Sequence, residues 1–108
     1  MGYGDYMRST DVNWTPQETE VAVKAYFDLL DQESQGKIIS RQSVYDRLAA
    51  ERLTRRTSRA VEYRFQNIEA VMAEENLRGL GMAPRYHSSR LTRAAVLAAV
   101  VGCKLVQA

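Results

Sequence analysis

A chain of 108 residues with a formal net charge of +2 has room for one domain, because a second hydrophobic core needs roughly another 100 residues. Hydrophobic residues make up 45% of the chain and charged residues 26%, as in ordinary globular proteins. A single cysteine, Cys103, and a single histidine, His87, exclude a disulfide framework and a cysteine-based zinc site, so we expect no metal and no cofactor.

The distribution of charge along the chain is more informative than its sum. Residues 1–36 carry seven acidic and two basic side chains, residues 37–66 carry eight basic and three acidic ones, and residues 67–108 carry five basic and three acidic ones. Arginine dominates, with 12 of the 15 basic residues. Such a block is typical of a surface that binds nucleic acid, although a solvated Arg-rich surface gives the same count.

No segment predicts export or insertion into a membrane. The first ten residues contain no apolar stretch, and the longest apolar run, residues 94–101, falls short of the roughly 20 residues that span a bilayer. We therefore expect a cytoplasmic protein without a membrane partner. Residues 1–12 are expected to form a flexible tail before a single helical domain at residues 13–108, which is either complete or cut from a longer protein.

The first two helices are predicted from their caps. Residues 15–18, Thr-Pro-Gln-Glu, form a capping box with proline in the first turn, directly after Trp14. The helix that follows is about 20 residues long and is expected to end at Gly36. A second helix is expected to begin at Ser40 and to fade at residues 51–53, with Val44 and Leu48 facing inward.

The third and fourth helices follow after short polar segments. The third is expected from a cap at Thr57 or Ser58 to residues 76–79, with its apolar stripe formed by Val61, Phe65, Ile68 and Met72. Gly and Pro at residues 79–84 interrupt regular structure. The fourth helix is expected after Ser88 or Ser89, with an apolar face of Leu91, Ala94, Ala95, Ala98 and Val101. We therefore expect an all-α bundle of about four helices, in which the second and third form a helix-turn-helix-like pair.

Arginines gather at the junction of the second and third helices. Arginine binds phosphate and guanine edges bidentately, glutamine and asparagine pair with adenine, and a helix N-terminus favours anions. The sequence therefore predicts a surface for double-stranded DNA, on which arginines hold phosphates while Tyr63, Gln66 and Asn67 contact or orient bases. The expected binding residues are Arg52, Arg55, Arg56, Arg59, Tyr63, Arg64, Gln66, Asn67 and Arg85.

An enzyme is not expected, and neither is a small-molecule substrate. His87 lies too close in sequence to Ser88 and Ser89 to form a catalytic triad with them, and no carboxylates recur at the spacing of metal ligands. A homodimer would not exclude DNA binding, and the alternative to DNA binding is a protein–protein interaction module without nucleic-acid contact. Its contact faces would be the acidic first helix and the small-residue fourth helix, and its sign would be an exposed apolar patch on the fourth helix.

Several segments resemble one known family. They are Trp14-Thr15 with Glu18, residues 22–27 (Ala-Val-Lys-Ala-Tyr-Phe), residues 56–58 and 61–71, and residues 81–85 (Gly-Met-Ala-Pro-Arg). Over residues 13–100 this pattern is similar to the N-terminal helical module of HNH-type, McrA-like restriction endonucleases and related bacterial defence proteins. The resemblance implies an accessory helical domain that contacts DNA in restriction or phage defence. Glu69 and Met82-Ala83 depart from the family pattern, and the absence of an HNH motif means that no nuclease activity carries over.

Overall fold

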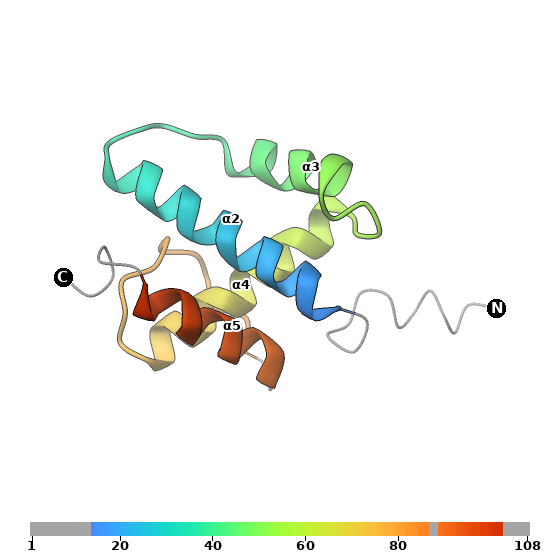
Figure 1. The fold of residues 1–108 in the computed structure, drawn as a ribbon. Helices are drawn as coiled ribbons and strands as arrows, with labels where there is room; N and C mark the ends of the chain where they lie inside the picture. Colours follow the sequence, from blue (N-terminus) through green and yellow to red (C-terminus); the bar gives the residue numbers. More distant parts are fainter. Residues whose placement is uncertain (1–13, 87–88, 103–108) are drawn as a thin grey trace.

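Four helices make up the part of the chain that the computed structural model describes, residues 14–86 and 89–102 (Figure 1). They are α2 (Pro16–Ser34), α3 (Arg41–Glu51), α4 (Ser58–Glu74) and α5 (Arg90–Val101), and no strand occurs in these two stretches. The predicted all-α bundle is thereby confirmed, whereas the helix-turn-helix-like interpretation of α3 and α4 stays a prediction. The expected tail at residues 1–12, together with His87, Ser88 and Cys103, lies outside the described residues.

Each helix begins at a residue whose side chain caps it. Thr15, Ser40, Thr57 and Ser89 each accept a hydrogen bond from a backbone N–H in the first turn of α2, α3, α4 and α5, respectively. At the first helix the predicted capping box is present, since the Glu18 side chain in turn accepts from the Thr15 N–H. Gly36 follows α2 with a φ of 85°, a left-handed conformation that glycine adopts without steric cost.

Helix α4 occupies the centre of the bundle. It packs against α2, α3 and α5, while α2 also lies along α5 (Figure 1). Phe65 of α4 is fully buried and makes edge-to-face ring contacts with Tyr26 of α2 and Tyr45 of α3, with centroids 5.7 and 5.2 Å away. The predicted stripe of α4 is the core of the molecule, because Val61, Phe65, Ile68 and Met72 are all inaccessible to solvent.

Helix α5 buries only part of the face expected for it, since Ala95 packs against the core and Leu91 is partly buried. Thr92 and Val96 are its buried residues, and Ala94, Ala98 and Val101, which were expected on its apolar face toward the core, face solvent. The reason is that α5 is apolar around nearly its whole circumference, so the sequence pattern does not select one side. No helix in the described part of the chain has both the length and the apolar character to cross a membrane.

Candidate nucleic-acid interface

Two of the arginines expected on the DNA-binding surface lie in the protein interior. Arg56 is 5% exposed and Arg64 is 3% exposed, and their guanidinium carbons lie 4.8 and 4.4 Å from the centroid of the buried Trp14 ring. The two cations thus stack on one indole at the start of α2. Their expected role as phosphate contacts does not fit this burial.

Hydrogen bonds fix both guanidinium groups in place. Arg56 donates from Nη2 and Nε to the Glu18 carboxylate at 2.7 and 3.2 Å, so the acid of the capping box is also half of an ion pair. Arg64 donates from Nη1 to the Thr92 hydroxyl at 2.8 Å, which ties α4 to α5. These residues join the first turn of α2 to the rest of the bundle. Trp14 and Arg56, two of the residues that carry the sequence resemblance, are in contact with each other here.

Arg59 and Tyr63, on the outer side of α4, form a cluster with Arg85 of the segment between α4 and α5. It is called the Tyr63 cluster below. Arg59 donates from Nε to the Tyr63 hydroxyl at 2.9 Å, and its guanidinium carbon lies 5.3 Å from the ring centroid. The guanidinium carbon of Arg85 lies 4.1 Å from the same centroid. Both arginines are exposed and Tyr63 is partly exposed. Residues 26 positions apart in sequence therefore meet on one ring at the surface.

Backbone contacts with α4 place Arg85 beside this ring. The Arg85 N–H donates to the Gln66 carbonyl at 3.0 Å, and Asn67 donates from Nδ2 to the Arg85 carbonyl at 2.6 Å. Asn67 therefore holds the loop, which matches the orienting role among the two roles expected for it and leaves base contact a prediction. The Gln66 side chain remains partly exposed on the same face, and Tyr86, next to Arg85, is 60% exposed.

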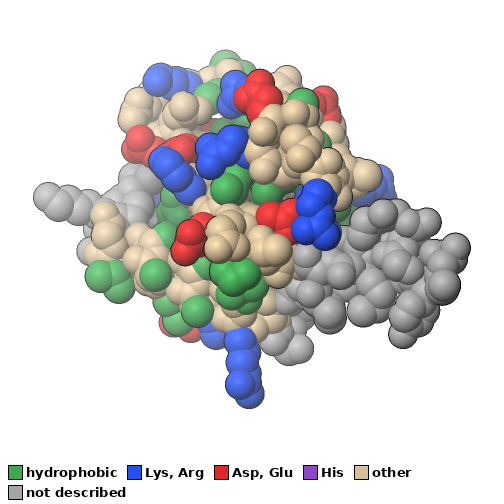
Figure 2. Space-filling view, turned by 45° about the vertical axis from the view of Figure 1, so that its right-hand side comes forward, with side chains coloured by type: hydrophobic (Ala, Val, Ile, Leu, Met, Phe, Trp, Pro, Cys, Tyr) green, Lys and Arg blue, Asp and Glu red, His purple; other side chains and the backbone are tan. Residues whose placement is uncertain are grey.

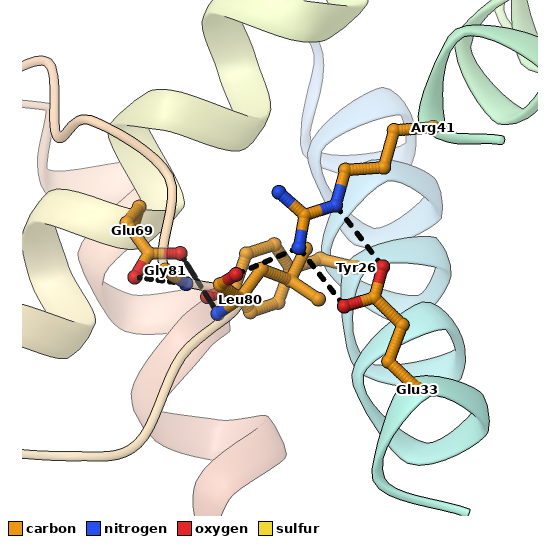
Figure 3. Close-up of polar contacts among 6 residues, drawn as sticks. All are labelled: Tyr26, Glu33, Arg41, Glu69, Leu80 and Gly81. Carbon is orange, nitrogen blue, oxygen red and sulfur yellow. Dashed lines mark hydrogen bonds and ion pairs between the residues drawn. The ribbon is translucent and has the colours of Figure 1, made fainter. Parts of the chain in front are cut away.

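The loop that carries Arg85 is also anchored at its start, by Glu69 of α4 (Figure 3). The Glu69 carboxylate accepts from the Tyr26 hydroxyl at 2.6 Å and from the N–H groups of Leu80 and Gly81 at 3.0 and 3.2 Å. Burial and this hydrogen bond raise the pKa of Tyr26, so its hydroxyl stays protonated and donates. A Cβ at Gly79 would lie 2.4 Å from Oε2 of Glu69, so the close approach requires glycine.

A second arm of the same network reaches α3. Arg41 donates to the Leu80 carbonyl at 2.7 Å and forms a two-point ion pair with Glu33 (Figure 3). The hydrogen bonds from Arg41 hold the pKa of Glu33 below its ordinary value. The loop start is thus held by side chains from α2, α3 and α4. Sequence reasoning missed Glu69 and Arg41 as residues that hold this loop, and the one available signal was the departure of Glu69 from the family pattern.

The remaining predicted arginines lie in the turn between α3 and α4. Arg52 and Arg55 are exposed, whereas Leu53 between them is buried and fixes the turn. Within residues 14–86 and 89–102, no carboxylate lies within ion-pair distance of Arg52, Arg55, Arg59 or Arg85. The structure therefore keeps four of the six predicted arginines available at the surface.

Acidic groups border this surface. Asp46 accepts a hydrogen bond from the Ser58 hydroxyl at 2.6 Å at the start of α4, and the bonds from Ser58 and Gln42 lower the pKa of Asp46. Glu62 lies close enough to act on the charge of Arg59. On the face of the molecule drawn in Figure 2, basic and acidic side chains are intermixed. The negative charge of Asp46 beside the N-terminus of α4 disfavours a bound anion at that terminus.

Comparison with protein-family models, with curated proteins and with solved structures returned no match to this chain. The resemblance to the module of restriction endonucleases therefore rests on the residues quoted for it. Among the described residues, no three His, Cys, Asp or Glu side chains gather closely enough to hold a metal ion.

Proposed function

We propose that this chain binds double-stranded DNA through the Tyr63 cluster and the neighbouring arginines of the α3–α4 turn, as an accessory module in restriction or phage defence. One observation carries the proposal. Arg59 and Arg85 come together on a partly exposed tyrosine ring, and neither has a carboxylate within ion-pair distance in the described structure. The defence role comes from the sequence resemblance alone.

The geometry of the cluster suits phosphate. The two guanidinium carbons lie 5.3 and 4.1 Å from one centroid, so their charges stand within a Debye length, about 10 Å at 0.1 M salt, and repel each other. A bound phosphate would relieve that repulsion. Arg59 uses its Nε N–H on the Tyr63 hydroxyl, and the Nη groups of both arginines can donate to phosphate oxygens.

The same geometry limits which residues read bases. Gln66 is partly exposed beside the cluster, and its amide can pair with an adenine edge. Asn67 is committed to the Arg85 carbonyl and acts by positioning that loop. In this proposal phosphate contacts supply most of the affinity, with sequence preference confined to few positions.

The proposal is tested by measuring duplex binding as a function of salt for the wild type and for Arg59→Ala/Arg85→Ala. Each lost phosphate contact should reduce the slope of log affinity against log salt by about 0.9, so the double variant binds more weakly and with a shallower slope. The matched control is Lys37→Ala/Arg78→Ala, which removes the same charge from exposed positions outside the cluster. No binding by the wild type at low salt, or equal losses in the two double variants, would overturn the proposal.

A further inference from the structure

Helix α5 exposes a second apolar face. Its outward residues Ala94, Leu97, Ala98 and Val101, called the α5 stripe, follow a spacing of three, one and three residues along one side of the helix. Leu97 is 36% exposed and Val101 is 79% exposed, while Val96 on the opposite side is fully buried. A helix that is apolar on both sides is normally covered on both. An exposed apolar patch on the fourth helix, the sign expected of a protein–protein interaction module, is thus present on α5.

An apolar pocket lies beside the stripe. It occupies about 290 Å³ between α2 and α5, with walls formed mainly by Val23, Phe27, Ala95, Ala98 and Ala99. An apolar cavity of about 150 Å³ already admits benzene, so this pocket has room for a branched aliphatic side chain. Charged residues of α2, Glu20, Lys24 and Asp28, form its rim.

The partly exposed Leu97 side chain and the pocket lie on one surface. Leu97 stands next to Ala98, and Ala98 belongs both to the stripe and to the pocket wall. In a two-fold symmetric pair each copy presents the same patch, so a knob on one copy needs a socket on that same patch of the other. A surface that carries both is self-complementary, which favours a second copy of this chain over an unrelated partner.

The charges at the two ends of the stripe favour one relative orientation of the two α5 helices in such a pair. Arg90, at the start of α5, is exposed and makes no ion pair with any described residue. The other end has no basic residue in the last turn of α5, and α2 runs alongside it in the same direction (Figure 1). Asp28 of α2, on the pocket rim, already pairs with Lys24 at 3.4 Å, so the negative end of α5 itself is the group that a second Arg90 would meet. An antiparallel crossing brings the Arg90 of each copy to the negative C-terminal end of the other helix.

The geometry points to a two-fold dimer of this chain, in which two α5 stripes cross antiparallel and Leu97 of each copy enters the α2–α5 pocket of the other. This dimer is independent of the proposed function, because it involves neither the Tyr63 cluster nor DNA. Ala94 and Ala98 allow the two helices to approach closely. Only one helix supplies the apolar contact, so the dimer is expected to be weak, with its mass rising toward twice the monomer at concentrations of about 10–100 µM.

Sedimentation equilibrium without DNA tests the dimer. Leu97→Glu places a charge in the pocket and should leave the protein monomeric at every concentration, with an unchanged circular dichroism melt. Ile38→Glu is the matched control, because Ile38 is a fully exposed aliphatic residue of the α2–α3 connection, and this variant should dimerise like the wild type. A monomeric wild type, growth beyond the dimer, or equal loss in both variants would overturn the inference.

Cross-linking tests the antiparallel geometry. Ala98 lies near the middle of the stripe, so its two copies face each other close to the two-fold axis. In a Cys103→Ser background, Ala98→Cys should form a disulfide-linked dimer under mild oxidation, because the proposed crossing brings the two Ala98 positions together and a disulfide requires Cα atoms roughly 4.4–6.8 Å apart. Ile38→Cys in the same background should stay monomeric, and equal cross-linking of the two variants would contradict the predicted crossing.

Discussion

Replacing Glu69 with alanine is expected to lower the free energy of unfolding by about 3 kcal/mol, a large part of the stability of a small domain. The carboxylate accepts hydrogen bonds from the Tyr26 hydroxyl and from the N–H groups of Leu80 and Gly81. Each buried donor that loses its acceptor costs about 1–3 kcal/mol, and the Tyr26 hydroxyl can compensate for only one of them by accepting from Leu80. Urea denaturation measures the loss.

Two other variants distinguish the loss of the Glu69 hydrogen bonds from a general effect of removing a negative charge on stability. Glu62→Ala removes an acid from a partly exposed site on the same helix and should change the stability by no more than about 0.5 kcal/mol. Glu69→Gln keeps one carbonyl acceptor and should fall between the two. If Glu69→Ala is no less stable than Glu62→Ala, the network does not hold the loop of Leu80 and Gly81.

The helices could be predicted because their signals are local. Thr15, Ser40 and Thr57 cap the helices that they were expected to cap, since a hydroxyl that accepts an N–H three residues ahead acts within one turn. The stripe of α4 is equally local, because residues three and four apart share one helix face. The buried side of α5 was predicted only in part: Ala95 packs against the core, but Ala98 and Val101 face solvent. The inward side of a helix that is apolar around most of its circumference depends on its neighbours.

The site could be predicted only in part, because burial of a charged side chain depends on a partner far along the chain. Arg55 and Arg56 are adjacent and look alike in the sequence. Arg56 is nevertheless buried, and it forms an ion pair with Glu18, 38 positions away. Conversely, Arg85 lies in a separate segment and reaches Tyr63 only because a loop anchored at Glu69 folds back on α4. Contacts of this kind arise from tertiary packing, and no periodic pattern in the sequence indicates them.

Arg56→Ala is expected to reduce the stability of the fold, whereas Arg55→Ala is expected to reduce DNA binding and leave stability nearly unchanged. Removing Arg56 leaves the mostly buried Glu18 carboxylate without its ion-pair partner and uncovers Trp14, at an expected cost of about 3 kcal/mol in unfolding free energy. Removing the exposed Arg55 should cost less than about 0.5 kcal/mol but weaken duplex binding and reduce its salt slope. Equal stability of the two variants would contradict the structural role of Arg56.

Acid titration supplies an independent check on the same ion pair. Burial raises the pKa of Glu18, but the hydrogen bonds from Arg56 and from the Thr15 N–H outweigh it and hold that pKa below its ordinary value of 4.5. The unfolded chain therefore takes up a proton at higher pH than the folded one. The stabilisation is fully present above the unfolded pKa and is lost as the pH falls through the folded pKa. The stability difference between the wild type and Arg56→Ala should thus narrow between about pH 6 and pH 3, and a constant difference would place the effect outside the ion pair.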